Sequence, residues 1–431
     1  MAMEDPGVSL DTLCYNLSNL QVLARQGSWK ALVDVIRQAR NLSLPQYPHE
    51  QLIYHAFLVL SHMKLRSYAD AALELEALDD FESPQYQYEH YPDLYPNRSG
   101  SMVPFVLRWL HAELPHYLNQ PLVTIERLYS LYEHCQRRID RLVASNVRYL
   151  KHAGDQTTDV TNTAVVNDEE EVKEGSVDCS LLNATTPDDG ASTCVDSEFG
   201  GFVSGMNAAL DDTEKLMEGQ KSSASDARLK RWRMRKEFAI NCILSHHINQ
   251  RDFVVALKWF KELFKIHPSD PWLFSKLGYM QMQMGDFKGA KNTFSEVECI
   301  ITKADVSNAL QSSALKGLIR RNKGLEHVVL KQYSEAIKEF DAALLMNPVD
   351  IISANNKALC YMYNRDLMGS TKVLESILDK APLIALNETL VLNLCSMYEL
   401  AFVHNHQTKK NLSEWIQQIA PGDFDFSCTR L

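Results

Sequence analysis

The sequence predicts an all-α protein, an α-solenoid of helix–turn–helix repeats, and two observations support this fold class. The first is the pattern Ala-x3-Phe-x2-Ala-x4-Pro, which the stretch YSEAIKEFDAALLMNP shows in full at residues 336–348. The second is its recurrence, because Ala256 and Phe260 keep the same spacing and Ala290 and Phe294 follow them 34 residues later. A period of 34 residues with these small and aromatic positions is typical of the tetratricopeptide repeat (TPR).

Each position of the pattern has a physical role in a pair of packed helices. The alanine is small because two helices cross closely there, and the aromatic residue four positions later lies on the same face. The proline ends the second helix of the pair. Gly278 and Gly324 occupy the matching small position in the first helix of their repeats. The step from Ala290 to Ala336 is 46 residues, so we expect lengthened helices or a loop near residues 300–312.

The net charge of −11 is concentrated in one segment of the chain. Residues 153–226 contain 17 acidic and 3 basic residues and few apolar ones, so we predict a disordered acidic linker. The sequence then divides into an N-terminal helical, degenerate TPR-like block at 1–150 and the linker at 151–227. An array of about four repeats is expected at 228–386, and C-terminal capping helices with a tail at 387–431.

The N-terminal block contains a helix–turn–helix unit in which Tyr68 and Ala72 are expected in TPR-like positions. The stretch FESPQYQYEHYPDLYPNRSGSMVP follows, and we expect it to be a long ordered loop. Its tyrosines could anchor a partner or could pack across the loop's own helices, and the sequence leaves both alternatives open. These tyrosines are Tyr86, Tyr88, Tyr91 and Tyr95.

The sequence gives no support for catalysis, because it has no phosphate-binding glycine loop, zinc-protease motif or nucleophile elbow. His246-His247 and His404-x-His406 are the nearest approaches to a metal pair, and no Cys or carboxylate is spaced to complete a tetrahedral site. We therefore expect structural histidines, no catalytic residue, no metal and no cofactor. The nine scattered cysteines form no CxxC pair, which favours a cytoplasmic location. No run approaches 18 apolar residues, so no transmembrane segment is expected.

A basic patch, RLKRWRMRK, precedes the repeats. It could contact a membrane surface, act as a nuclear import signal or bind nucleic acid. The simpler alternative is a solvated first turn of a helix, with Trp232 packing on the N-terminal block. Outside residues 153–226 the chain carries only +3, so we expect no nucleic-acid partner. The basic residues of the patch are Arg228, Lys230, Arg231, Arg233, Arg235 and Lys236.

A TPR array offers a concave groove lined by the first helix of each repeat, which suits a helix or extended segment of a large partner. The five positions of a chaperone-tail carboxylate clamp read Asn241, Ser245, Lys276, Leu318 and Asn322, and one cation among them would hold a carboxylate poorly. We therefore do not expect such a clamp. By register, the groove candidates are Asn241, Ser245, Asn249, Ser275, Tyr279, Gln283, Arg321, Leu325, Asn355, Leu359 and Tyr363.

Several stretches are more specific than a generic repeat. They are YPNRSGSMVPF with LRWLHAELPHYL, RLKRWRMR, MGDFKGAKNTFSEVE, NNKALCYMY, VLNLCSMYEL and FDFSCTRL, in this order. With these stretches the chain resembles the subunit 12 family of the trafficking protein particle (TRAPP) complex, across both folded blocks.

The resemblance implies a non-catalytic scaffold of a TRAPP III type tethering complex in ER-to-Golgi transport, Golgi organisation and autophagy. The implied partners are the large subunits 8, 11 and 13, the core exchange subunits and, indirectly, Rab GTPases. The implied location is the cytoplasm, peripherally at Golgi and ER–Golgi intermediate membranes. The alternatives are a TPR co-chaperone or cargo adaptor outside TRAPP, and an enzyme, which would need a buried acid–base pair in a pocket.

Overall fold

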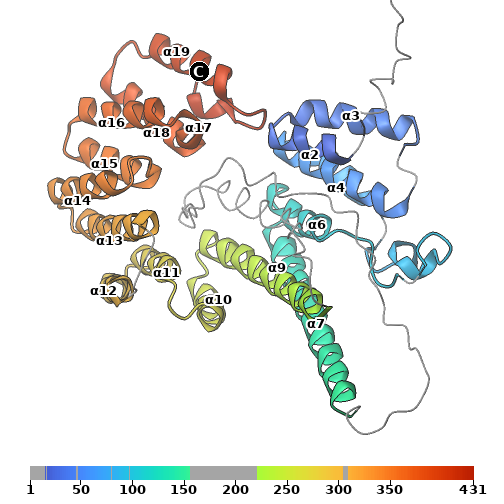
Figure 1. The fold of residues 1–431 in the computed structure, drawn as a ribbon. Helices are drawn as coiled ribbons and strands as arrows, with labels where there is room; N and C mark the ends of the chain where they lie inside the picture. Colours follow the sequence, from blue (N-terminus) through green and yellow to red (C-terminus); the bar gives the residue numbers. More distant parts are fainter. Residues whose placement is uncertain are drawn as a thin grey trace, which may run out of the picture. The chain divides into compact units, whose positions relative to one another are not determined.

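The computed structural model describes Tyr15 and residues 17–44, 47–78, 80–96, 98–155, 221–303 and 309–431. These residues form α-helices and short 3-10 turns, with one isolated bridge between Gln87 and Ser101 and no strand (Figure 1). The predicted all-α solenoid is therefore confirmed. Most of the predicted acidic linker, residues 156–220, lies outside the described residues.

The chain forms two compact units that divide within one helix. Unit 1 takes the described residues up to Asp155 and those from Lys221 to His246, and unit 2 takes those from His247 to Leu431. The repeat array was expected to begin at residue 228, yet the chain up to His246 belongs to the N-terminal unit. The physical reason is aromatic packing, because Phe238 lies 5.4 Å from Trp109 and 6.2 Å from Phe105 between ring centroids.

Unit 1 packs its helices around an aromatic and aliphatic core that includes the fully buried Leu58, Leu107 and Trp109. Pro48 at the first position of α4 starts that helix, and the Glu50 carboxylate accepts the backbone N–H of Tyr47 at 3.4 Å. The helices are α2 (Leu17–Arg25), α3 (Trp29–Asn41), α4 (Pro48–Lys64), α5 (Tyr68–Glu76), α6 (Phe105–Tyr117), α7 (Pro121–Asp155) and α9 (Lys221–Asn249), whose last residues belong to unit 2.

Two details of unit 1 refine the sequence analysis. The buried small residue of α5 is Ala71, whereas the predicted Ala72 is only half-buried, so the predicted register was wrong by one residue. The tyrosine-rich stretch is an ordered loop with two 3-10 turns, Pro84–Tyr86 and Tyr88–His90. The loop closes on itself, because the Tyr88 N–H donates to the carbonyl of Gly100 at 2.9 Å.

Unit 2 stacks antiparallel helix pairs in sequence order, as Figure 1 shows from α11 to α16. Aspartates start four of these helices, because Asp252, Asp270, Asp350 and Asp366 accept backbone N–H groups of the first turn. Helix α10 (Phe253–Ile266) comes first. The pairs that follow are α11 (Pro271–Gln283) with α12 (Phe287–Lys303), α13 (Ala309–Val329) with α14 (Tyr333–Met346), and α15 (Ile351–Tyr363) with α16 (Leu367–Lys380). After them come α17 (Pro382–Ala385), α18 (Glu388–Ala401), α19 (His406–Ile419) and a 3-10 turn at Phe426–Thr429.

The small and aromatic positions have the predicted roles. Ala290 and Ala336 are fully buried, and the rings of Phe294 and Phe340 lie on Gly278 and Gly324 of the preceding helix. The long 46-residue step is explained by lengthened helices. Helix α12 has 17 residues where α14 has 14, and α13 has 21 where α15 has 13.

Candidate functional site: the first helices of the repeats

The predicted groove residues lie on the first helices α9, α11, α13 and α15. Asn241 and Ser245 belong to unit 1, whereas the other nine, from Asn249 to Tyr363, belong to unit 2. Within unit 2 the candidates divide into side chains that connect repeats and side chains that stay exposed.

Three groove candidates connect neighbouring repeats. The Ser275 hydroxyl donates to Asn322 Oδ1 at 2.8 Å, which joins α11 to α13. Asn393 Nδ2 of α18 donates to Asn355 Oδ1 at 2.8 Å. Arg321 is only 8% exposed and has its own pair of partners.

The guanidinium of Arg321 in α13 contacts a side chain at the start of α15 and a side chain of α11. Its Nη1 lies 3.5 Å from Asp350 Oδ1, and its guanidinium carbon lies 5.6 Å from the ring centroid of Trp272. Asp350 is also the N-cap of α15, so one carboxylate both starts a helix and binds the preceding repeat. This arginine is therefore a structural contact between repeats.

The remaining candidates differ in exposure. Gln283 and Asn249 are exposed and Tyr279 is half-buried. Leu325 and Leu359 are partly buried against core clusters of their repeats. Tyr363 is 57% exposed, and its ring stacks on Tyr333 with centroids 5.0 Å apart. The exposed candidates of unit 2 are thus the last residues of their helices: Asn249 of α9, Gln283 of α11 and Tyr363 of α15.

Two of the five positions of a carboxylate clamp are buried, so their side chains are not available to a partner's C-terminal carboxylate. Leu318 is 1% exposed and Asn322 is 2% exposed. A carboxylate clamp needs several cations that converge on one anion. Neither buried side chain can contribute to such a clamp in this structure.

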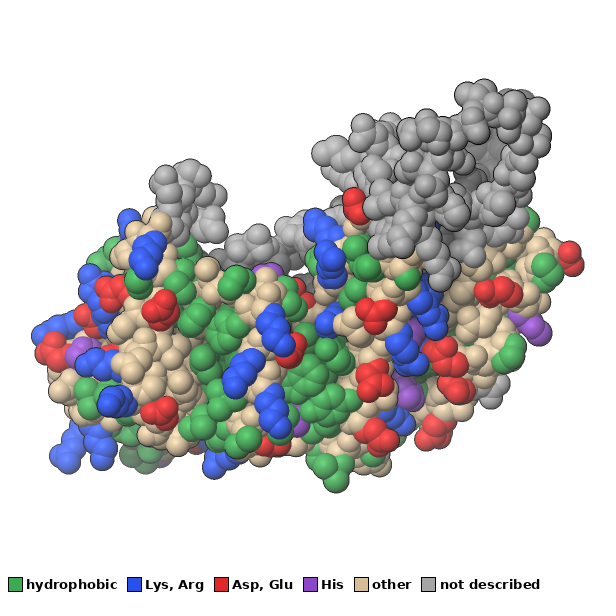
Figure 2. Space-filling view, turned by 90° about the horizontal axis from the view of Figure 1, so that it is seen from below, with side chains coloured by type: hydrophobic (Ala, Val, Ile, Leu, Met, Phe, Trp, Pro, Cys, Tyr) green, Lys and Arg blue, Asp and Glu red, His purple; other side chains and the backbone are tan. Residues whose placement is uncertain are grey.

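The basic patch is partly a packing surface. The Arg235 guanidinium lies 4.7 Å from the Trp232 ring centroid and 5.2 Å from that of Phe105, and Lys236 Nζ lies 5.2 Å from that of Tyr132. The ring of Trp232 packs against Phe105 of α6 and His134 of α7, with centroids 6.5 and 5.7 Å apart, as the simpler alternative predicted. Lys230 and Arg233 are exposed. On the face drawn in Figure 2, basic, acidic and hydrophobic side chains are interspersed.

The paired histidines have protein partners. His246 Nε2 lies 2.8 Å from Glu113 Oε1 within unit 1, and the two side chains are 6% and 11% exposed. His247 Nδ1 lies 3.4 Å from Asp252 Oδ2. No group of three metal-ligating side chains occurs among the described residues. The partner of His246 lies 133 residues earlier in the sequence, where no local pattern could identify it.

Two of the four loop tyrosines are buried inside unit 1. Tyr88 is 8% exposed and Tyr95 is 5% exposed, and the Arg98 guanidinium lies over both rings. His49 Nδ1 lies 2.6 Å from the Tyr95 hydroxyl. For these two residues the packing alternative holds, whereas Tyr86 and Tyr91 are half-buried.

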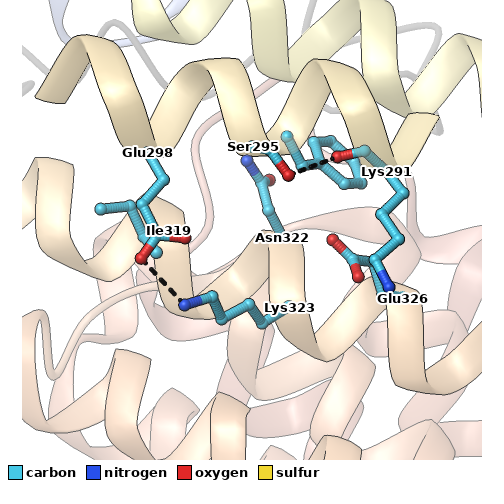
Figure 3. Close-up of a pocket in the computed structure, with 8 residues that line it drawn as sticks. Lys291, Ser295, Glu298, Ile319, Asn322, Lys323 and Glu326 are labelled. Carbon is cyan, nitrogen blue, oxygen red and sulfur yellow. Dashed lines mark hydrogen bonds and ion pairs between the residues drawn. The ribbon is translucent and has the colours of Figure 1, made fainter. Parts of the chain in front are cut away.

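A small pocket between α12 and α13 was missed in the sequence analysis (Figure 3). The signal was a change of residue type within the repeat register. Lys291, Glu298 and Glu326 stand where the next pair of repeats has apolar side chains. A second small pocket beside α7 is lined by Glu82, His134, Arg137, Arg138 and Arg141.

Comparisons with known proteins agree with the family resemblance. Trafficking protein particle complex subunit 12 of Homo sapiens is 27% identical over 370 residues, which cover 86% of this chain and 41% of the human protein. The Mus musculus protein of the same name is 26% identical and is covered to 38%. The chain therefore spans about two fifths of the length of the curated relatives it matches. No protein-family model matches.

Solved structures show only a distant likeness. A human IFIT1 dimer structure aligns with a TM-score of 0.36 at 11% identity, covering 97% of this chain and 74% of that chain. This score is too low to carry an inference. No described helix is long and apolar enough to cross a membrane. The predicted resemblance is confirmed by the curated relatives: the chain is similar over most of its length to trafficking protein particle complex subunit 12.

Proposed function

We propose that this chain is a non-catalytic scaffold subunit of a TRAPP III type tethering complex. In this role it links the large subunits 8, 11 and 13 to the Rab-exchange core in ER-to-Golgi transport, Golgi organisation and autophagy. It acts in the cytoplasm, peripherally at Golgi and ER–Golgi intermediate membranes. The observation that carries the proposal is the similarity to subunit 12 across 86% of this chain.

The chemistry of the described residues supports a scaffold. Burial raises the pKa of Cys135 to about 12 and the pKa of Cys360 and Cys395 to about 11, which is the opposite of an activated nucleophile. The array also presents exposed aromatic and aliphatic side chains at the ends of its first helices, such as Tyr363 and Met284, that can anchor a partner.

A tagged full-length chain, purified from native lysate with mass spectrometry of the eluate, tests this proposal. Near-stoichiometric recovery of core and large TRAPP subunits is the expected result. Recovery of chaperones alone, or of the chain by itself, would replace this proposal with an adaptor role outside TRAPP.

A pair of surface variants then tests whether the first helices bind the partner. Tyr363→Asp changes an exposed residue at the end of α15 and is expected to reduce subunit recovery. Leu345→Asp changes an exposed residue of the second helix α14 and is the control, because that helix does not line the groove. Melting curves of both variants show whether each remains folded. Equal recovery with both variants would place the binding surface elsewhere.

A further inference from the structure

The pocket beside α7 in unit 1 gathers three arginines. Arg137, Arg138 and Arg141 line it from neighbouring turns of one helix, and Glu82 and His134 complete the lining. Its volume is about 120 Å³, and a cavity of about 150 Å³ holds a benzene molecule. This arginine pocket therefore has room for one side chain of a ligand, and its chemistry is that of an anion site.

Two carboxylates close to the arginine pocket already have other partners. Glu82 Oε1 accepts from Arg108 Nη1 at 2.7 Å. Asp140 Oδ1 accepts from the amide Nε2 of Gln136 at 2.8 Å. Neither carboxylate therefore neutralises the arginines of α7.

Two of the arginines are exposed and have no carboxylate within 4 Å among the described residues. The Nε of Arg137 donates only to the backbone carbonyl of Glu133 at 3.4 Å, and Arg141 has no ion pair. Elsewhere on the surface such cations are paired, as Lys338 is with Glu335 at 2.8 Å. Like charges four residues apart destabilise a helix, so an external anion would relieve the repulsion between Arg137 and Arg141.

The histidine of the arginine pocket reports its positive potential. Burial, with Arg108, Arg138 and Arg137 adding to it, lowers the pKa of His134 to about 4. Glu82 opposes this shift without cancelling it. Nearby positive charge disfavours a protonated ring, so the histidine stays neutral near pH 7 and the pocket keeps an excess of guanidinium charge.

The basic patch of α9 runs along the same stretch of α7. The Arg138 guanidinium lies 5.4 Å from the ring centroid of Trp232, and Lys236 Nζ lies 5.2 Å from that of Tyr132. The two helices therefore run in opposite directions where they touch. Arg228 lies one turn before Trp232 on the same face of α9, which places a further cation beside the turns of α7 that follow Arg138.

The chain itself supplies the complementary charge. Residues 156–220 contain 15 acidic and 2 basic residues. They lie outside the described residues, but they follow the end of α7 at Asp155 and precede the start of α9 at Lys221. Their densest run of acid is Asp168–Glu171, four carboxylates in succession. The most acidic part of the chain thus begins and ends on the two helices that present the arginines.

The distance between this acidic run and the arginine pocket fits the chain length between them. Arg141 is 14 residues before Asp155 on α7, a span of about 21 Å at the rise of an α-helix. Asp168 is 13 residues after Asp155, and a flexible chain of that length has a root-mean-square span of about 20 Å. A tether whose span matches the distance gives the highest effective concentration, in the millimolar range.

We propose that the arginine pocket binds the acidic run Asp168–Glu171 of the same chain. Its carboxylates accept from the guanidinium groups of Arg137 and Arg141, whose planar forks match a carboxylate. Exposed ion pairs are individually weak and screened by salt, so the contact is reversible. An acidic polypeptide from another protein would have to displace this run. The inference goes beyond the proposed function, because the contact lies within one chain.

Zero-length crosslinking of the full-length chain tests the contact directly. A carbodiimide joins a lysine amine to a carboxylate that touches it, and Arg141→Lys supplies the amine while keeping the charge. Position 141 is expected to couple to residues 168–171 at least ~10-fold more often than position 37 does in Arg37→Lys, because a cluster of like charge concentrates counter-ions. Arg37 is the matched control, an exposed arginine of α3 that has no ion pair among the described residues.

Two further measurements define the crosslink. A mixture of ¹⁵N-labelled and unlabelled chain shows whether both ends belong to one molecule, and crosslinks within one molecule are expected. Their yield at position 141 is expected to fall at least ~3-fold as the ionic strength rises from about 0.05 to about 0.5 M, because salt screens exposed charges.

Competition with an external ligand tests whether the chain's own run occupies the pocket. The probe is fluorescein-labelled decaglutamate, and the neutralised chain carries Asp168→Asn, Glu169→Gln, Glu170→Gln and Glu171→Gln. The probe is expected to bind the neutralised chain at least ~3-fold more tightly than the native chain, because the tethered run no longer competes.

Arginine variants in the neutralised chain locate the probe. Arg137→Gln combined with Arg141→Gln is expected to weaken the probe at least ~10-fold, whereas Arg37→Gln is expected to leave its affinity unchanged. All three arginines are exposed, so these changes should preserve the fold, and melting curves of each variant verify this.

Equal crosslinking at positions 141 and 37 would overturn the inference. A probe that binds the native and the neutralised chain equally would also overturn it, and would show that the arginines are free to bind an acidic polypeptide of another protein. A probe whose affinity does not depend on Arg137 and Arg141 would show that these residues form no anion site. All of these tests use the chain without any other subunit, so their outcome is independent of the proposed function.

Discussion

The ring of Phe340 lies against Gly324 so closely that a Cβ on that glycine would come within 2.6 Å of a ring carbon. The same arrangement recurs one repeat earlier, where Phe294 meets Gly278. Each aromatic ring thus packs on the first helix of its own repeat. The missing side chain of the glycine lets the two helices of a repeat approach at this point.

Two glycines of α13 provide a test of this contact within one helix. Gly324→Ala is expected to lower the free energy of unfolding by about 1–3 kcal/mol, because the new methyl group overpacks the Phe340 ring. Gly317→Ala is the control, since its nearest neighbour would lie at an ordinary 3.7 Å. There the substitution should stabilise by about 0.5–1 kcal/mol, because alanine favours the helix. Urea unfolding of both variants measures the difference, and equal effects would contradict the packing.

The repeat pattern could be predicted because its positions lie close together in sequence. Ala336, Phe340 and Gly324 fall at fixed spacings within one helix pair, so the packing follows from local register. Long-range partners leave no such signal. Arg321 was expected to face a groove, but its partner Asp350 and the ring of Trp272 come from neighbouring repeats.

The pair Glu113 and His246 is expected to hold α9 on α6. Its atoms are 2.8 Å apart and its side chains are almost fully enclosed. His246→Ala leaves a buried carboxylate without its partner and is expected to cost about 3–5 kcal/mol of unfolding free energy. Glu113→Gln should cost less, because an amide can still accept from the ring.

Thermal unfolding of the two variants measures this difference. Glu262→Gln is the control, since Glu262 pairs with Lys265 on the surface and such a pair contributes little. A loss for His246→Ala no larger than for this control would show that the buried pair is not important for holding the helix.

Unit 1 is expected to lose stability in mild acid through two partly buried histidines, His111 and His134. Burial, together with nearby arginines, lowers the pKa of His111 and of His134 to about 4. The unfolded chain takes up these protons near its ordinary pKa of about 6.5, whereas the folded chain does so only near 4. The contribution is therefore fully present above pH ~6.5 and is lost as the pH falls toward 4.

Urea unfolding at several pH values between about 7.5 and 4.5 measures the slope of stability against pH. His111→Gln and His134→Gln should each flatten it, by about 1–2 kcal/mol over this range after allowance for partial exposure. His404→Gln, at an exposed position, should leave the slope unchanged. An unchanged slope in all three variants would exclude these two histidines as its source.

Packed and exposed residues of the basic patch are expected to contribute differently to the free energy of unfolding. Arg235 lies over the rings of Trp232 and Phe105, so Arg235→Ala should lower the unfolding free energy by about 1–2 kcal/mol through lost cation–π contact and packing. Arg233 is exposed, and Arg233→Ala should change it by less than about 0.5 kcal/mol. Arg235→Lys keeps the charge without the planar group and should fall between the two. Calorimetric melting ranks the three variants by stability. If Arg235→Ala is as stable as Arg233→Ala, the contacts of Arg235 with Trp232 and Phe105 do not stabilise unit 1.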